Sequence, residues 1–159
     1  SVLSFGKIIG EGSTNIIPDE VKLEGTFRTM DEEWRFDAHK KMKALAESIA
    51  LGMGGSCDFD VRVGYPYLVN DEVVTDTHIQ AAKEYLGEEN VVDLDLRMTA
   101  EDFSYYSQVA PVCFYRLGTR NEAKGITSGL HTSTFDIDSK ALEIGMGVMA
   151  YGAIKQLLK

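Results

Sequence analysis

The sequence predicts a mixed α/β (α+β) protein built from two parts, and three observations support this. Apolar and polar residues alternate along residues 21–28 and 59–65, as they do in strands with one buried face. Between these segments, apolar residues recur at helical spacing. After residue 70, short helical and apolar segments follow each other in turn, which favours layered α/β packing. We therefore expect one domain in residues 1–70 and a second in residues 71–159.

The first domain is expected to begin with two strands. Residues 2–10 are a mostly apolar run that is closed by Gly10-Glu11-Gly12. In residues 21–28 the alternation turns one set of side chains toward a core and the other set away from it. The core-facing set is Val21, Leu23 and Phe27, and the outward-facing set is Lys22, Glu24, Thr26 and Arg28.

A helix and a third strand complete this domain. Thr29 and Glu32 have the spacing of a capping box, which marks a helix start, and glycines from Gly52 onward should end the helix. Residues 59–65 then form a strand that Pro66 ends. The order strand, strand, helix, strand is most of a ferredoxin-like unit whose first strand and helix are missing. The buried helix face should consist of Trp34, Ala38, Met42, Leu45 and Ile49.

The second domain should alternate helices with short strands. Its last helix contains Gly145, Gly147 and Gly152, each of which costs about 1 kcal/mol against alanine, so we expect them to allow close packing on a sheet. A polar loop at residues 118–130 precedes this helix. The expected elements are a helix at 76–86 closed by Gly87, a strand at 91–94, a helix from Thr99 to Tyr106, a strand at 111–117, and a last helix capped by Asp138 or Ser139 and running to Leu158.

Composition limits the classes of function. The 159 residues are 44% hydrophobic and 26% charged, as in ordinary globular proteins, and a net charge of −9 leaves no basic face for nucleic acid. No apolar run approaches the roughly 18 residues that span a bilayer, so we expect no membrane partner. No signal peptide opens the sequence, and we expect a cytoplasmic protein. The absence of a signal peptide carries little weight, because residues 1–5 are typical of the inside of a strand and not of a natural start. Cys57 and Cys113 are expected to be reduced, mostly buried thiols.

Histidine 131 is the first candidate for chemistry. It lies at the end of the polar loop, where a neutral imidazole could bind a metal, act as a general base or do neither. His39 and His78 lie on helices among polar neighbours and are expected to be solvated. Ser128 and Ser133 flank His131, but nothing in the sequence marks either as an activated nucleophile.

Arg28 is the second candidate, because it ends its strand on the polar face. A guanidinium there can bind a carboxylate through two parallel hydrogen bonds, although a surface ion pair with Glu24 or Asp31 explains the residue equally well. Asn15, in the turn after Gly12, could donate an amide hydrogen bond to a ligand, or it could simply belong to the turn.

The adjacent carboxylates Glu101 and Asp102 are the third candidate. Such a pair suits acid–base work, but just inside a helix N-terminus the helix dipole accounts for it as well, and we prefer that account. The sequence contains no G-x-S-x-G, H-E-x-x-H or C-x-x-C motif and no phosphate loop.

Three blocks together resemble one family. They are residues 12–21 (GSTNIIPDEV) leading to 23–28 (LEGTFR), residues 100–106 (AEDFSYY) and residues 129–138 (GLHTSTFDID). In this order and at this separation they resemble the metal-dependent aminoacylase and carboxypeptidase family of amidohydrolases. The nearest branch is that of hippurate hydrolases, N-acetyl-diaminopimelate deacetylases and auxin-conjugate hydrolases. The similarity covers nearly the whole chain.

The resemblance implies a three-layer α/β/α catalytic domain with an inserted lid domain that also forms a homodimer. Residues 1–70 would be the later part of the lid, and residues 71–159 the C-terminal part of the catalytic domain. His131 would be the last ligand of a site for two divalent metal ions, such as zinc, manganese, cobalt or nickel. Asn15 and Arg28 are thirteen positions apart, as in the family. They would hold the carboxylate of an N-acyl amino acid or small peptide substrate, often across the dimer.

The chain also departs from the family. The Cys-x-His and Glu-Glu motifs, which supply the other metal ligands and the catalytic glutamate, have no match here. A catalytic metal usually needs about three protein ligands, so we expect a C-terminal fragment of an amidohydrolase that is inactive by itself. The alternative is a non-catalytic binding or dimerisation module built on the lid's sheet. A serine hydrolase centred on His131 is a third, weaker hypothesis.

Overall fold

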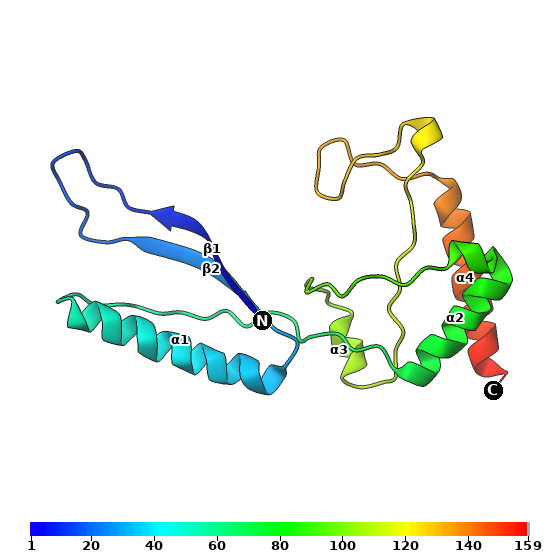
Figure 1. The fold of residues 1–159 in the computed structure, drawn as a ribbon, viewed down its shortest axis with the longest axis horizontal. Coiled ribbons are helices and arrows are strands. Elements are labelled where there is room, and N and C mark those ends of the chain that lie inside the picture. Colours follow the sequence, from blue (N-terminus) through cyan, green and yellow to red (C-terminus); the bar gives the residue numbers. More distant parts are fainter. Residues whose placement is uncertain (159) are drawn as a thin grey trace. The chain divides into compact units, whose positions relative to one another are not determined.

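The computed structural model describes residues 1–158, which form two compact units. Unit 1 consists of residues 1–68 and 96–105, and unit 2 of residues 69–95 and 106 onward. The α+β class is confirmed, because helices and a two-stranded antiparallel sheet occur in the same chain (Figure 1). That residues 1–70 and 71–159 are parts of a lid and a catalytic domain stays a prediction.

Unit 1 begins with the predicted pair of strands. β1 (Val2–Ile9) and β2 (Lys22–Arg28) run antiparallel, in a register that pairs Val2 with Arg28 and Ile9 with Lys22. The pairing shifts between Phe5 and Lys7, so Gly6 forms a bulge. The long connection between the strands, residues 10–21, therefore lies at the opposite end of the hairpin from Arg28.

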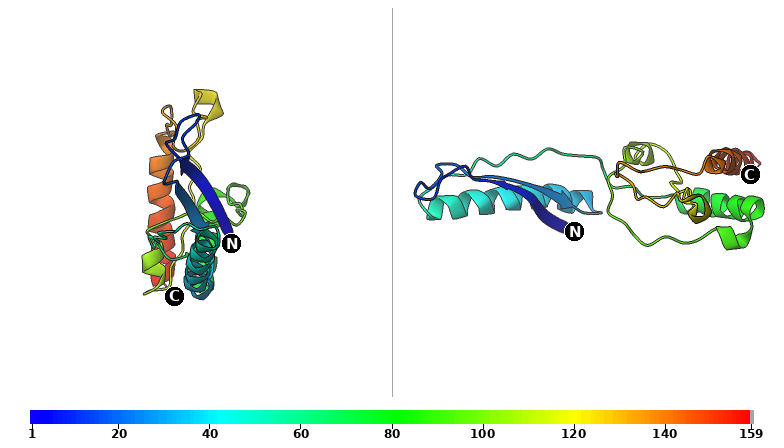
Figure 2. Two further views of the ribbon diagram at one scale, coloured as in Figure 1. Left: turned by 90° about the vertical axis from the view of Figure 1, so that its left-hand side faces the viewer. Right: turned by 90° about the horizontal axis from the view of Figure 1, so that it is seen from above.

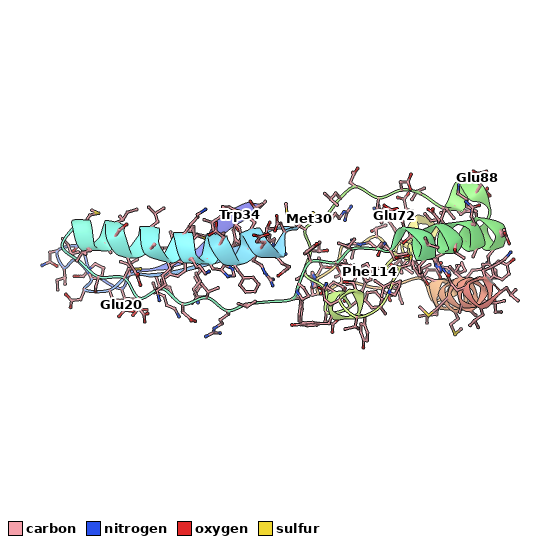
Figure 3. All side chains as sticks on the ribbon, turned by 90° about the horizontal axis from the view of Figure 1, so that it is seen from below. Glu20, Met30, Trp34, Glu72, Glu88 and Phe114 are labelled. Atoms are coloured by element: carbon pink, nitrogen blue, oxygen red, sulfur yellow. The ribbon has the colours of Figure 1, made fainter. Side chains whose placement is uncertain are left out.

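The 21-residue helix α1 (Glu32–Gly52) follows. In Figure 1, α1 and the hairpin lie close together near the N-terminus and diverge toward the long connection between the strands. The helix is confirmed, but the predicted Thr29 cap is wrong. Asp31 immediately precedes the helix, and its carboxylate accepts a hydrogen bond from the Trp34 amide at 2.9 Å, so the first turn is already capped. Trp34 is in this first turn (Figure 3).

The predicted apolar core of unit 1 is only partly formed. Phe27 of β2 contacts the ring of His39 edge to face, with centroids 6.2 Å apart, so this side of the hairpin does face α1. Val21 and Leu23 on the same side are nevertheless more than half exposed, and Ala38 is the single buried residue of α1. The predicted buried stripe of α1 is therefore wrong for Trp34, Leu45 and Ile49, which are exposed.

Residues 59–65 do not form the predicted strand. A strand requires a neighbour for its backbone hydrogen bonds, and β2 pairs only with β1 among the described residues. Two side chains of α1 hold the end of this segment instead. Arg35 donates from Nη1 to the Tyr65 carbonyl at 2.7 Å, and the Tyr67 amide donates to Glu32 at 3.1 Å. Arg35 and Glu32 also pair with each other.

Unit 2 is built on two helices that lie side by side, α2 (Glu72–Leu86) and α4 (Lys140–Leu157) (Figure 2). α2 begins four residues before its predicted start, because Asp71 caps it by accepting a hydrogen bond from the Val74 amide at 2.9 Å. It ends at Gly87, as predicted, where φ is +93°.

The three glycines of α4 were expected to allow close packing on a sheet. Gly147 and Gly152 instead allow close packing on α2, while a Cβ added to Gly145 would meet Leu117. A Cβ added to Gly152 would overlap the ring of His78, and one added to Gly147 would overlap the Tyr85 side chain. Both contacted residues belong to α2, and the described part of unit 2 contains no strand that could pack there. The two helices approach closely because glycine leaves room for these rings.

The expectation that His39 and His78 are solvated is wrong. His78 stacks on Tyr115 with centroids 4.4 Å apart, and its Nε2 is buried without a hydrogen-bond partner in the described structure. Burial lowers the pKa of His78. Burial also lowers the pKa of His39, which Phe27 and Phe36 contact edge to face. Both rings are therefore half-buried against aromatic side chains, although Arg35 and Glu32 also lie close enough to His39 to act on its charge.

The predicted strands at 91–94 and 111–117 are also absent from the described structure. At 111–117 the side chain of Asn70 takes the place of a neighbouring strand. It accepts from the Phe114 amide at 2.7 Å and donates to the Phe114 carbonyl at 2.9 Å, and the Asp71 amide donates to Val112. Figure 3 marks Phe114 on this segment.

Three short helical elements complete the described structure. The predicted helix from Thr99 to Tyr106 is reduced to α3 (Ser104–Ser107), and residues 88–90 form the short 3-10 helix η1 (Glu88–Asn90). Residues 118–130 form the expected loop, which contains the 3-10 helix η2 (Glu122–Lys124). None of the helices in residues 1–158 is long and apolar enough to cross a membrane.

Candidate substrate and metal site residues

Arg28 is exposed at the end of β2, on the polar face of the hairpin. Its Nη1 donates to the backbone carbonyl of Met98 at 2.9 Å, which belongs to the stretch 96–105 of unit 1. The two carboxylates expected as surface partners are engaged elsewhere. Glu24 pairs with Lys7 and Lys22, and Asp31 caps α1. Within residues 1–158 Arg28 therefore has no carboxylate partner, and the rest of its guanidinium is available to a bound anion.

Lysines 7 and 22 set the charge around this face of the hairpin. Lys22 and Lys7 approach Glu24 at 2.9 and 3.2 Å, and their hydrogen bonds lower the pKa of Glu24. With Arg28 at the end of the strand, this face carries three cations and one carboxylate. It is locally positive in a chain whose net charge is −9. Such a face attracts anions, including carboxylates.

Asn15 lies in the long connection between β1 and β2. The backbones of Ser13 and Ile16 bond to each other in both directions, at 3.0 and 3.1 Å, and Ser13 Oγ donates to Asn15 Oδ1 at 3.2 Å. Gly12 is required for this turn, because a Cβ there would overlap the carbonyl of Ile16 and the ring of Pro18. The turn lines an open hollow, and Asn15 is one of its walls.

The structure does not bring Asn15 and Arg28 together. Arg28 pairs with Val2 at one end of the hairpin, and Asn15 lies beyond the other end, past the pair Ile9 and Lys22. A strand rises about 3.3 Å per residue, so the length of β2 alone separates them by roughly 20 Å. One small carboxylate cannot contact both side chains of the same chain.

Glu101 and Asp102 precede the short helix α3. Glu101 accepts from the Phe103 amide through Oε1 at 3.3 Å, and its carbonyl accepts from the amide and the hydroxyl of the fully buried Ser104. The Asp102 carbonyl accepts from the Tyr105 amide at 3.1 Å. α3 begins only at Ser104 and has no acidic residue in its first turn, so the expected position of the pair just inside a helix N-terminus is wrong.

His131 is exposed in the loop before α4, and it is the single non-glycine residue with positive φ in the described structure, at +62°. Thr132 Oγ1 donates to the Gly129 carbonyl at 2.8 Å, and the Phe135 amide donates to the Thr132 carbonyl at 3.2 Å. A left-handed backbone outside glycine is uncommon and often marks a functional position. The loop thus presents His131 in a specific conformation.

The residues of this chain do not by themselves fit a metal centre. In residues 1–158 no three histidine, cysteine, aspartate or glutamate side chains gather closely enough to hold a metal ion. Both cysteines are free and half-buried, and burial raises the pKa of the Cys113 thiol, which disfavours the thiolate that binds metals. His131 can supply one ligand, and a set of three ligands would need residues from outside the described part of the chain.

Asp138, seven positions after His131 in the sequence, makes more contacts than a helix cap requires. Asp138, considered only as a helix cap, accepts hydrogen bonds from Asn121, Lys124 and the Lys140 amide. Lys124 and then Asn121 lower the pKa of Asp138 to about 2. Asn121 and Lys124 lie seventeen and fourteen positions before Asp138, and no sequence pattern indicated that they would contact its carboxylate.

Comparison with known proteins places this chain in a peptidase family. The model of peptidase family M20/M25/M40 matches residues 4–154, so the chain belongs to that family. Two curated relatives, each matched over 97% of this chain, are thermostable carboxypeptidase 2 of Saccharolobus solfataricus, 36% identical, and the putative amidohydrolase YhaA of Bacillus subtilis, 32% identical. The chain spans 39% of the length of each of these relatives.

A solved structure is similar as well. The Bacillus subtilis YXEP protein, described as a dinuclear metal binding peptidase of the M20 family, matches 96% of this chain with a TM-score of 0.72 and 30% identity. The match covers 41% of that protein. The family resemblance predicted from the three sequence blocks is thereby confirmed.

Proposed function

We propose that this chain is the C-terminal part of a metal-dependent amidohydrolase that cleaves the amide bond of N-acyl amino acids or small peptides. The observation that supports this most is that Arg28, an exposed guanidinium on a positive strand face, has no carboxylate partner in the described residues. Its task is to bind and orient the substrate's carboxylate. The family match and the names of the relatives support hydrolysis of peptide or amide bonds.

Substitution of Arg28 tests this role. In the complete enzyme, Arg28→Ala should raise KM for an N-acyl amino acid by tenfold or more, because a charge-assisted contact contributes on the order of 1.5–3 kcal/mol. Arg28→Lys should recover part of the loss, since lysine keeps the charge but not the paired hydrogen bonds. The matched control is Arg62→Ala, a surface arginine of the same unit. Unchanged kinetics for Arg28→Ala would refute the assignment.

The proposal also includes a homodimer in which Asn15 and Arg28 of one binding site come from different chains. The roughly 20 Å between them along the hairpin supports this, because one chain cannot place both on the same carboxylate. A mixture of Asn15→Ala and Arg28→Ala chains tests it. Random pairing in a twofold dimer should then restore about a quarter of the activity, whereas sites built from one chain should restore none.

His131 is proposed as one metal ligand of the complete site, with the metal and the remaining ligands lying outside the described residues. By itself the chain should hydrolyse no N-acyl amino acid when zinc, manganese, cobalt or nickel is added, because one histidine cannot hold a catalytic metal. Hydrolysis by the purified 159-residue chain, abolished by chelation, would contradict this part of the proposal.

The second candidate function is a non-catalytic dimerisation or binding module. The two-stranded sheet favours it, since β1 and β2 each have an edge that is unpaired in the described structure and can accept another strand. Zinc titration of the complete protein separates the two candidates. A pure module should bind zinc no more tightly than its His131→Ala variant, whereas the hydrolase should lose affinity in that variant.

A further inference from the structure

The carboxylate of Asp138 joins three segments of unit 2. Oδ1 lies 2.7 Å from Nζ of Lys124 and accepts from the Lys140 amide at 3.2 Å, while Oδ2 accepts from Nδ2 of Asn121. The Asp138 side chain is only 14% exposed, so these partners replace most of its contact with water. One carboxylate therefore ties the turn around η2 to the first residues of α4.

Backbone hydrogen bonds complete this connection. The Asp138 amide donates to the Thr119 carbonyl at 2.9 Å. Asn121 and Ile126 bond to each other through their backbones in both directions, at 3.0 and 2.9 Å, and so close the turn that presents Asn121 and Lys124. Residues 127–137 form a loop that begins at one side of this base and ends at the other. His131 lies in the middle of the loop that they form.

The contacts inside the loop are few and local. Ser128 and Thr134 share a hydrogen bond between their hydroxyls at 2.8 Å, Thr132 Oγ1 donates to the Gly129 carbonyl at 2.8 Å, and the Phe135 amide donates to the Thr132 carbonyl at 3.2 Å. Against these contacts stands the left-handed backbone of His131, a conformation that costs on the order of 1–3 kcal/mol outside glycine. Such a conformation persists only where the surroundings hold it, and the base at Asp138 is the most connected part of those surroundings.

We infer that Asp138 is a positioning residue for His131, which it acts on by closing the base of the loop 127–137. Without this closure the loop ends are free to separate, and His131 relaxes out of the left-handed region. The hydrogen bonds and the ion pair of Asp138 show how the loop is closed. That this closure serves to present an imidazole to a metal ion rests on the proposed function.

The test is NMR spectroscopy of the full chain carrying Asp138→Asn. Two signals report the loop: hydrogen exchange at the Phe135 amide, and the strong contact between the amide and Hα protons of His131 that a positive φ produces. Exchange at Phe135 should become at least about tenfold faster, and the His131 signal should weaken, while amides in α2 and α4 keep their protection. Asp138→Glu, which keeps the carboxylate, should be affected less.

Two further variants make the result decisive. Lys124→Met removes only the ion pair and should accelerate Phe135 exchange by a few-fold; it decides the question if Asp138→Asn unfolds unit 2. Glu122→Gln is the matched control, because the exposed Glu122 side chain pairs with Arg120 of the same turn and, among the described residues, with no other cation. Wild-type signals at Phe135 and His131 in both Asp138→Asn and Lys124→Met would overturn the inference.

Metal content of the complete enzyme separates this inference from the proposed function. If His131→Ala retains its metal, His131 is not a metal ligand, while the NMR result still decides whether Asp138 closes the base of the loop. If His131→Ala loses metal but Asp138→Asn binds it with wild-type affinity, the positioning role fails and the proposed function stands.

Discussion

The long helix of unit 1 buries one residue, Ala38, whereas the helix pair of unit 2 buries Thr77, Ala81 and Ala82 from α2 and Ala141, Val148 and Gly152 from α4. The buried residues of unit 2 are small, so the helix backbones approach closely. Unit 1 is held mainly by its strand ladder and by polar contacts such as Arg35 to Tyr65 and Arg28 to Met98. Close helix packing depends on residue size, whereas a hairpin with few buried side chains depends on hydrogen bonds.

The largest expected effect comes from filling a glycine notch in unit 2. Gly152→Ala should destabilise the chain by about 1–3 kcal/mol, because the new methyl group overlaps His78, which is confined between α4 and Tyr115. Gly147→Ala is the matched control. Its methyl group meets Tyr85, which is 48% exposed and can turn away, so the gain of about 1 kcal/mol in helix propensity should cancel most of the cost. Urea unfolding followed by circular dichroism measures both; equal losses would mean that the notch at Gly152 is not special.

A smaller effect is expected in unit 1, where a single cap starts the long helix. Asp31→Ala should cost about 1 kcal/mol, because the amide of Trp34 loses its acceptor. Thr29→Ala should change stability by less than about 0.5 kcal/mol, since Thr29 lies outside the first turn. Unfolding by urea compares the two variants, and a larger loss for Thr29→Ala would restore the capping box that the sequence suggested.

Mild acid is expected to lower the stability of unit 2 through His78. The pKa of His78 is lowered by burial from its ordinary value of 6.5, so below about that pH the unfolded chain binds more protons than the folded one. Stability should therefore be retained above pH 6.5 and decline as the pH falls below it. Urea midpoints at pH 7.5 and 5.5 measure this decline, which should be smaller in His78→Gln. A variant with the wild-type decline would show that His78 is not its source.

The smallest effect at ordinary pH belongs to Asp138. Its pKa is lowered from 3.8 to about 2 in the folded chain, so the unfolded chain takes up a proton first as the pH falls. The stabilisation is complete above about pH 4 and is lost between pH 4 and 2. Thermal unfolding across this range should show a shallower decline for Lys124→Met, which lacks the main cause of the shift. An identical decline would exclude the ion pair as that cause.

Local sequence patterns predicted the helices and the hairpin better than the other strands. Gly87 ends α2 as expected, and the alternation in residues 21–28 became β2. The apolar runs at 59–65, 91–94 and 111–117 did not become strands in the described structure, because a strand depends on a pairing partner whose position the local sequence does not encode. At 111–117 that partner is the side chain of Asn70.

For the site, the sequence by itself determined which residues are candidates and to which family the chain belongs, since His131, Arg28 and Asn15 lie in blocks typical of that family. Only the tertiary structure decided how they are arranged. The register of β1 and β2 separates Asn15 from Arg28, and Asp138 meets Lys124 and Asn121 at the base of the His131 loop. The physical reason is that caps and turns depend on neighbours in sequence, whereas strand partners, ion pairs and buried rings depend on residues that folding brings together from distant positions.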